Sequence, residues 1–453
     1  MHAGMPSRRE FLRVGLTGVA SLSLPGLLRL KAIAGLAGPR ERTAIIVVFL
    51  HGGASHLETY DPKPLAPAEY RGPYGTIAGR AAGMTLSELL PKHAAIADKF
   101  TILRSMVHTG FCHGIGQQQM FTGHEIRDFK PRAEHPDFLS ITDRLRSKSG
   151  RDLPNYVGVS PIPYLSAAYL GPDNEPFAVN GNPGAPGFSV PNIGLADPVR
   201  VGRLREQLEL RDSLDRMRAQ IDKAAGMHAM DSFEETAWNM LTSPEAAAAF
   251  DLNREDAGVR ERYGPSSWGH QCLMARRLVE AGVDLVTVTL AGPEAGRVQN
   301  WDDHAVNHHV FDAMKARAPI FDQAVTALIE DVHDRGLDKR VMVLVTGEFG
   351  RTPKISYAPD SGSGVMQPGR DHWPSATSML FSGGGIEPGR VIGATDRRGE
   401  QVVERRIGVA DFLATVYRHL GVDPTGIEFN DRSGRPIPIL SEGVAIPELV
   451  ARS

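Results

Sequence analysis

The sequence predicts an α/β fold in which helices flank a mostly parallel sheet, and two observations lead to this class. Three runs, AIIVVFL (44–50), LVTVTL (285–290) and VMVLVT (341–346), are continuously apolar and rich in β-branched residues. Strands that are covered on both faces have this pattern, whereas half-exposed strands alternate. Between the last two runs, apolar residues recur at spacings of three and four, as on one face of a helix.

Two helices are predicted around the second run. One is WGHQCLMARRLVEAG, which ends at Gly282 and precedes the strand. The other contains the apolar positions from Phe311 to Val332 and ends before Gly336. Glycine is the usual residue just past a helix end. Helix followed by strand is the unit from which parallel sheets are built.

The middle of the chain is different in composition. Residues 151–200 are rich in Pro, Gly and Asn, which predicts a long irregular stretch over the sheet. Residues 200–250 are charged and helix-prone, which indicates a solvated helical subregion. We expect one domain over residues 41–447, with an irregular and helical insertion around 151–250.

The N-terminus predicts export. SRREFL is followed by an apolar segment and by the small residues Ala32 and Ala34, which is typical of a twin-arginine signal peptide over residues 1–34. The alternative is a core helix preceded by two arginines. We therefore expect the twin-arginine export machinery as a partner and a periplasmic or otherwise exported protein. After cleavage, no apolar run is long enough to predict a membrane span.

Charge and cysteine content exclude some classes of protein. The formal net charge is −3 and no basic patch stands out, which argues against a nucleic-acid partner. Two cysteines, Cys112 and Cys272, cannot form a disulfide framework. Whether these two residues pair is left open.

Carboxylates and histidines follow each predicted strand. They are His51, His56, Glu58 and Asp61 after the first, Asp302, Asp303, His304, His308 and His309 after the second, and Glu348, Asp371 and His372, with the cation Arg370 beside them, after the third. The carboxyl ends of parallel strands meet at one edge of a sheet, where ligands bind. Oxygen and nitrogen donors from separate loops suit one or two divalent metal ions, with zinc, calcium and manganese as options.

From this set we select Glu348, Asp303, His304 and His372 as metal ligands, with Glu58 or Asp61 completing the site. Each residue has an alternative role. Glu348 could cap a turn or pair with Arg351, and Glu58 and Asp61 could set the turn before Pro62. His51 and His56 could hydrogen-bond locally, and His308 and His309 are expected at the surface, while His333 and His419 lie on helical patterns and are expected to be structural.

The motifs GGASHLETYDPKP, WDDH, GEFGRTP, GRDHWP and GRPIPIL together resemble the bacterial family known as domain of unknown function 1501. That family is regarded as a relative of the alkaline phosphatase and sulfatase superfamily. The resemblance implies a sulfatase-like sandwich with metals at the strand ends. It also places His113 where sulfatases carry their nucleophile, because the segment up to Thr122 has the same layout.

The sequence departs from the superfamily pattern at several points. Glu348, Phe349 and Gly350 stand where Asp-His-Gly is usual, and His51 and Gly52 replace a pair of aspartates. His113 could attack the substrate, bind metal or act as a general base. Cys112 could be a nucleophile, although a structural role is favoured because no partner is evident.

Three functions remain from the sequence. The first is an exported metal-dependent hydrolase of phosphate or sulfate esters, on a small molecule or glycan, in which His113 acts at the attacking position and Arg104 or Arg351 binds the anionic group. The second is a noncatalytic binding or scaffold protein that keeps the fold and a metal. The third, a carboxylesterase suggested by HGG at 51–53, is set aside because no G-x-S-x-G elbow is present.

Overall fold

The computed structural model describes residues 42–146, 152–191, 193, 243–292 and 300–451. The predicted signal peptide and most of the predicted helical subregion, residues 194–242, lie outside these residues. Residues 43–453 group as one compact unit.

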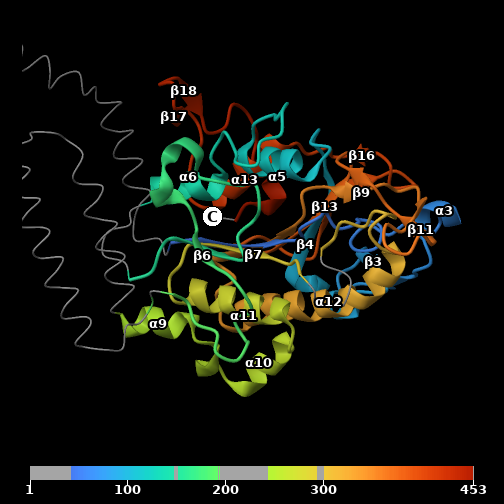
Figure 1. Cartoon of the computed structure of the whole chain (residues 1–453), viewed down its shortest axis with the longest axis horizontal. Helices are drawn as coiled ribbons and strands as arrows, with labels where there is room; N and C mark the ends of the chain where they lie inside the picture. The colour runs from blue at the N-terminus through green and yellow to red at the C-terminus, as the bar shows by residue number, and fades with distance from the viewer. Residues whose placement is uncertain (1–41, 147–151, 192, 194–242, 293–299, 452–453) are drawn as a thin grey trace, which may run out of the picture. The chain divides into compact units, whose positions relative to one another are not determined.

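An eight-stranded sheet forms the centre of this unit, in the order β14-β4-β13-β8-β1-β7-β5-β6 (Figure 1). Its strands are β1 (Ala44–Phe49), β4 (Phe100–Met106), β5 (Tyr156–Val159), β6 (Phe177–Val179), β7 (Leu285–Thr289), β8 (Val341–Thr346), β13 (Thr377–Gly383) and β14 (Val391–Ile392). The three strands predicted from apolar runs are β1, β7 and β8.

These three strands lie side by side in the middle of the sheet and run parallel. β1 pairs with β7 on one side and with β8 on the other. Every residue of all three strands is buried, which explains why their sequences do not alternate. β13 is antiparallel to β4 and to β8. The prediction of a mixed, mostly parallel sheet is confirmed.

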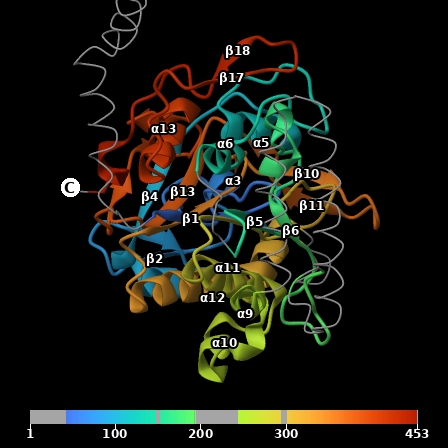
Figure 2. The ribbon, with the colours of Figure 1, turned by 90° about the vertical axis from the view of Figure 1, so that its left-hand side faces the viewer.

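Helices cover both faces of the sheet (Figures 1 and 2). One face is covered by α4 (Pro91–Ala95), α9 (Pro244–Phe250), α11 (Ser267–Glu280) and α12 (Val310–Asp334), with α10 (Ala257–Tyr263) packed on α11 and α12. The other is covered by α5 (His113–Thr122), α6 (Phe138–Leu145) and α13 (Val409–His419). Alternate residues of β1 supply the two cores, with Ile46 and Val48 facing α11 and α12 and Ile45 and Val47 facing the opposite way.

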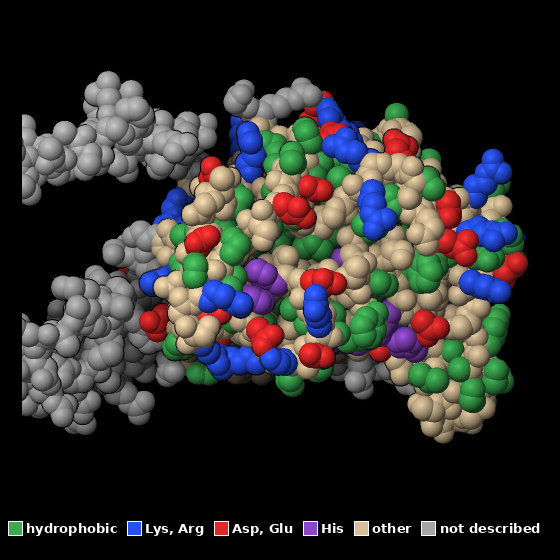
Figure 3. All heavy atoms as spheres, turned by 90° about the horizontal axis from the view of Figure 1, so that it is seen from above, with side chains coloured by type: hydrophobic (Ala, Val, Ile, Leu, Met, Phe, Trp, Pro, Cys, Tyr) green, Lys and Arg blue, Asp and Glu red, His purple; other side chains and the backbone are tan. Residues whose placement is uncertain are grey.

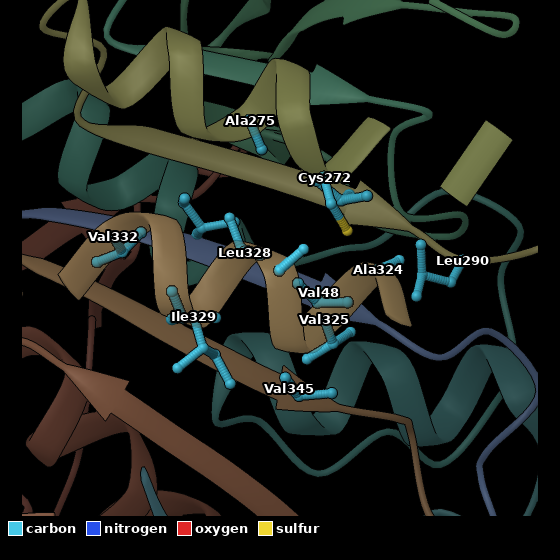
Figure 4. Packing of buried hydrophobic residues seen from close by; sticks show 14 of the residues in the cluster. Val48, Cys272, Ala275, Leu290, Ala324, Val325, Leu328, Ile329, Val332 and Val345 are labelled. Atoms are coloured by element: carbon cyan, nitrogen blue, oxygen red, sulfur yellow. The ribbon is translucent and has the colours of Figure 1, made fainter. Parts of the chain in front are cut away.

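Figure 4 shows how α11 and α12 close the first core. Val325, Leu328 and Val332 of α12 point toward the strands, as the predicted spacing requires. Cys272 of α11 is fully buried in this layer, and burial raises the pKa of its thiol to about 12. Cys112 precedes α5 on the opposite face, and both cysteines are free.

The Pro- and Gly-rich stretch contributes to the sheet itself. Within residues 151–200, β5 pairs in parallel with β7 and with β6, so the region adds the last two strands of the sheet. These strands have four and three residues, too short for a periodic pattern to reveal. The rest of the described stretch is irregular, with single turns at Ala168–Leu170 and Pro172–Asn174.

Small elements decorate the carboxyl edge and the periphery. They are α3 (Ala68–Arg71), the single turns Ala97–Lys99, Leu252–Arg254 and Pro447–Leu449, and the strand pairs β2 (Thr76–Ala78) with β3 (Thr85–Ser87), β9 (Gly350–Arg351) with β12 (His372–Trp373), β10 (Ser356–Pro359) with β11 (Met366–Gly369), β15 (Ala394–Thr395) with β16 (Val402–Glu404), and β17 (Glu428–Asn430) with β18 (Pro436–Pro438).

The surface in Figure 3 mixes acidic, basic and apolar side chains over the face shown. Within the described part of the chain, no helix combines the length and the apolar content needed to cross a bilayer.

Candidate functional site

The carboxyl edge of the sheet gathers polar side chains from five segments. β1, β4, β7 and β8 all end at this edge, and antiparallel β13 begins there, since Thr377 pairs with Met106 and Phe49 pairs with Thr346. His51 follows β1, His113 opens α5 after β4, and His372 precedes β13. The register of the sheet therefore brings together side chains that are far apart in the sequence.

Asp302 lies at the centre of a cluster of histidines. Its Oδ1 atom is 3.2 Å from His113 Nε2, 3.1 Å from His304 Nε2 and 3.3 Å from His372 Nε2. The Nε2 atom of His372 is also 3.2 Å from that of His113 and 3.0 Å from that of His304. Three imidazole nitrogens thus surround one carboxylate oxygen, and we call these four residues the Asp302 cluster.

The outer nitrogen of each ring in this cluster meets an acceptor. His113 Nδ1 lies 2.6 Å from Glu348 Oε1, and His304 Nδ1 lies 2.7 Å from Asp371 Oδ1. His372 Nδ1 donates to the carbonyl oxygen of Phe111 over 2.9 Å. With the proton on Nδ1, each neutral ring presents the lone pair of Nε2 to its neighbours. Metal-binding histidines almost always have such partners.

Hydrogen bonding alone does not account for the contacts of Asp302 Oδ1. Arg351 Nη2 lies 2.7 Å away, so four nitrogen atoms approach this single oxygen. A carboxylate oxygen offers about two lone-pair sites. Ligand atoms that share a cation at about 2.0–2.2 Å lie roughly 3.3–3.5 Å apart in a tetrahedral arrangement, close to the spacing here. The donor set therefore fits a divalent metal.

Within the described residues, His113, Asp302 and His372 form a group whose ligand atoms all lie within 4.8 Å of one another. His304 adjoins this group through Asp302 and His372. All four side chains are partly buried, with exposed fractions of 25% for His113, 24% for His304 and 18% for Asp302 and His372. A small ion could therefore reach them from solvent.

Charges in the cluster shift the pKa of each partner. Burial lowers the pKa of His113, but hydrogen bonds to Asp302 and Glu348 outweigh it and raise this pKa to about 9. Burial opposes ionisation of Asp302, yet hydrogen bonds from the histidines hold its pKa well below the ordinary value. A bound cation would release the Nε2 proton of His113, because ligating imidazole must be neutral.

Glu348 lies behind His113. Its side chain is fully buried, and its carboxylate accepts hydrogen bonds from Gly52 N (3.0 Å), His113 Nδ1 and Gln117 Nε2 (3.2 Å). Burial raises the pKa of Glu348, but the hydrogen bond from His113 and the charges of His113 and His51 outweigh it and lower this pKa. The carboxylate selected from the sequence as a ligand thus orients the histidine that faces the cluster.

Gly52 makes this arrangement possible. Its φ is +110°, and a Cβ atom there would lie 2.4 Å from the backbone nitrogen of Asp302. Only glycine tolerates both the backbone conformation and this close approach. The HGG sequence is thus explained by packing of the first strand end against the Asp302 loop.

Asp303 faces away from the Asp302 cluster. Its carboxylate is fully buried and bonded to Arg317 Nη2 at 2.6 and 2.5 Å and to His308 Nε2 at 2.8 Å. Arg317 in turn lies 4.4 Å from the centre of the Trp301 ring. The neighbouring Asp302, which is not among the ligands selected from the sequence, occupies the central position instead.

Glu58, Asp61 and Arg104 lie apart from the cluster. Glu58 is buried against Arg370 Nη2 at 2.7 Å and the hydroxyl of Ser55. Asp61 is buried beside Lys63 at 2.9 Å and Arg104 Nε at 3.4 Å.

Arg104 and Arg351 use their donors within the protein. Arg104 donates to the carbonyl oxygens of Tyr60 and Thr85 at 2.8 and 2.7 Å. Arg351 is fully buried and donates to the carbonyl oxygens of Gly52 and Gly53 as well as to Asp302. Both guanidinium groups therefore hold loops of the carboxyl edge in place.

The fold and the cluster define an α/β protein with an imidazole and carboxylate site at the carboxyl edge of a mostly parallel sheet. The chain belongs to the family described as protein of unknown function, DUF1501, whose model matches residues 42–450. The resemblance drawn from the motifs is confirmed at this level. A comparison with curated proteins gave no match.

Several solved structures are similar to this chain. The PsFucS1 sulfatase from Pseudoalteromonas sp. has 12% identity, covers 92% of this chain and 72% of its own, and has a TM-score of 0.37. A protein in the alkaline phosphatase superfamily from Vibrio parahaemolyticus has 11% identity, coverages of 85% and 67%, and a TM-score of 0.37. The phosphonate monoester hydrolase of Agrobacterium radiobacter has 12% identity, coverages of 90% and 77%, and a TM-score of 0.36.

Proposed function

We propose that the protein is an exported, metal-dependent hydrolase of phosphate or sulfate esters whose cation is held by the Asp302 cluster. The observation that supports this most strongly is that three imidazole rings have the same orientation. His113, His304 and His372 each direct Nδ1 to an acceptor and Nε2 to Asp302. The ligand atoms of His113, His372 and Asp302 lie close enough together to share one ion. Two nitrogens and one oxygen suit zinc better than calcium, which prefers six to eight oxygen ligands.

A bound divalent cation would supply Lewis acidity, which activates water and stabilises negative charge on a phosphoryl or sulfuryl group. The protein residues position that centre. Glu348 and Asp371 fix the rings of His113 and His304, and Arg351 balances the charge of Asp302. His113 would then hold the cation and would not itself attack the ester.

The proposed substrate is an anionic ester, on a small molecule or on a sulfated or phosphorylated glycan. The layout of the segment that ends at Thr122, which resembles the sulfatase nucleophile segment, supports this choice. α5 also begins at His113, and the positive end of a helix dipole favours an anion nearby. Export rests on the SRREFL segment and stays a proposal.

A second candidate is a noncatalytic binding protein that keeps the metal. The arginines favour it, because the guanidinium groups of Arg104, Arg351 and Arg370 are all engaged with carboxylates and carbonyl oxygens. None of these three is therefore left to bind the anionic part of a substrate.

Elemental analysis of the protein purified without chelator tests both candidates. We expect near-stoichiometric metal in the natural chain and its loss from the double variant Asp302→Asn, His372→Ala. His333→Gln is a matched control, because His333 contacts Ser382 outside the cluster. Turnover on a panel of phosphate and sulfate esters that disappears in the double variant would support the hydrolase. Metal without turnover would favour the binding protein, and a folded chain that takes up no metal would overturn both.

A further inference from the structure

His51 is a fourth histidine beside the Asp302 cluster, and its hydrogen bonding is reversed. Its Nδ1 atom faces a donor, Gln117 Nε2, at 3.3 Å. The other three rings direct Nδ1 to oxygen acceptors. Since a ligating histidine normally donates its outer N–H to an acceptor, His51 does not share the pattern of the ligands.

Glu348 fixes which end of the Gln117 amide faces His51. The amide nitrogen of Gln117 lies 3.2 Å from Glu348 Oε1, and a carboxylate needs a donor at that position. Turning the amide over would place two oxygens against each other in a fully buried site. The nitrogen therefore stays between Glu348 and His51 and donates one hydrogen to each.

The tautomer of His51 follows from this arrangement. Because Nδ1 accepts from Gln117, the proton of the neutral ring is on Nε2. No partner for His51 Nε2 is found among the described residues, and the side chain is partly exposed. The ring centre lies 6.1 Å from that of His113. The ring that carries this N–H is thus a direct neighbour of the His113 ring.

One buried carboxylate consequently favours opposite tautomers of two histidines. Glu348 accepts directly from His113, which leaves a lone pair on His113 Nε2, and it acts on His51 through Gln117, which leaves a proton on His51 Nε2. A metal ion held by its ligands and a hydrogen-bond donor nearby can together stabilise the negative charge of an anionic ester.

We propose that His51 is a substrate-contacting residue, whose Nε2–H donates a hydrogen bond to an anionic oxygen of the ester held at the Asp302 cluster. This inference rests on the proposed function. Gln117 is the positioning residue that holds His51 in the donor tautomer. No bond to His51 forms or breaks in this role.

The tautomer can be measured directly in the full chain loaded with zinc and labelled with ¹⁵N at histidine. A two-bond ¹H–¹⁵N correlation spectrum reports which ring nitrogen carries the proton, and His51→Phe assigns the signal by its disappearance. We expect the proton on Nε2 of His51, and a mixture of tautomers in Gln117→Met. A proton on Nδ1 in the natural chain would overturn the proposal.

Binding of inorganic phosphate gives a second readout. We expect His51→Phe to weaken phosphate affinity about tenfold, the effect of losing one hydrogen bond to a charged group, with unchanged zinc content. Gln117→Met should give a smaller loss, and His333→Gln should bind as the natural chain does. Unchanged affinity in His51→Phe, or no phosphate binding by the natural chain, would contradict the role of His51.

The two proposals fail in distinguishable ways. If the natural chain takes up no zinc, the proposed function fails, and the tautomer measured in the metal-free chain still decides whether Gln117 sets His51 as inferred. If zinc binds and esters are cleaved while His51→Phe keeps full activity and phosphate affinity, the hydrolase stands and the role of His51 is wrong.

Discussion

Asp302 and Asp303 are adjacent in the chain and lie in opposite environments. Asp303 is fully buried, and its partners Arg317 and His308 satisfy it from within the protein. Asp302 is partly exposed, and four nitrogen atoms approach its Oδ1 atom, which has about two lone-pair sites. One aspartate stabilises the loop, and the other has an arrangement that a cation would complete.

The difference shows how residues that stabilise the fold can be distinguished from residues that form a binding site within one group of polar side chains. The buried carboxylate of Asp303 has a countercharge, Arg317, at hydrogen-bonding distance. At Asp302 the three histidines compete for one oxygen, and their approach to one another is unfavourable if they carry protons. We expect changes at the first cluster to alter unfolding and changes at the second to alter metal binding.

The largest effect is expected from Arg317→Leu. This change leaves the carboxylate of Asp303 buried without its main partner, which typically costs about 3–5 kcal/mol. Urea unfolding monitored by circular dichroism would measure the loss. The double variant Arg317→Leu, Asp303→Leu should recover much of it. A loss below about 1 kcal/mol for the single variant would contradict the structural role of this pair.

Acid should destabilise the buried structure through His419, which lies far from the cluster in sequence. The ring donates from Nε2 to the carbonyl oxygen of Ala44 over 2.8 Å, and burial lowers its pKa from 6.5 to about 4. The unfolded chain therefore binds the proton first. Stability from this group is complete above pH 6.5 and is lost as the pH falls toward 4, by up to about 3 kcal/mol.

His419→Gln removes this titration and should flatten the melting temperature between pH 6.5 and pH 4. Differential scanning calorimetry at several pH values would measure the slope, with His309→Gln as a control for an exposed histidine. An unchanged slope in His419→Gln would show that other groups cause the acid sensitivity.

Asp302→Asn should lower metal affinity by about a hundredfold or more, because losing a ligand exceeds the 10–100-fold effect of losing a partner behind a ligand. The melting temperature of the metal-free chain should change less than in Arg317→Leu. Competition with a chromogenic chelator gives the affinity. Equal affinity in the natural chain and the variant would remove Asp302 from the site.

A smaller effect is expected from Glu348→Gln, which keeps the shape and removes the charge behind His113. Metal affinity should fall by about 10–100-fold, measured by the same competition. Glu58→Gln is the matched control, since Glu58 is an equally buried glutamate that pairs with Arg370. The control should lower stability with little change in affinity, and the reverse order would contradict the assignment of Glu348.

The sequence predicted those parts of the fold in which a regular pattern of apolar residues extends over a whole helix or strand. β1, β7, β8, α11 and α12 follow from continuous apolar runs and from three-and-four spacing, because burial on two faces or on one face dictates the residue types. The short strands β5 and β6 did not stand out, since their pairing with β7 depends on contacts across the sheet and their four and three residues carry no period.

The sequence placed the candidate site at the carboxyl edge of the sheet, and the structure brings some of the selected residues together there. The structure brings His113, His304 and His372 together. His304 and His372 follow the parallel strands β7 and β8, whereas His113 follows β4, which antiparallel β13 separates from β8. The choice between Asp302 and Asp303 could not be made from the sequence, because it depends on how Trp301 is buried and on the position of Arg317. The place of Glu348 behind His113 likewise depends on side-chain packing and not on its position after β8.

The hydrogen bond from Gly52 to Glu348 joins residues that are 296 positions apart in the chain. His113 and His372 are separated by 259 positions and also meet. No nascent chain that ends before His372 can contain all four residues of the cluster. Binding of the proposed metal by the complete cluster would therefore follow the synthesis of most of the polypeptide and the assembly of the sheet. Metal content would thus report the completion of folding as well as the integrity of the site.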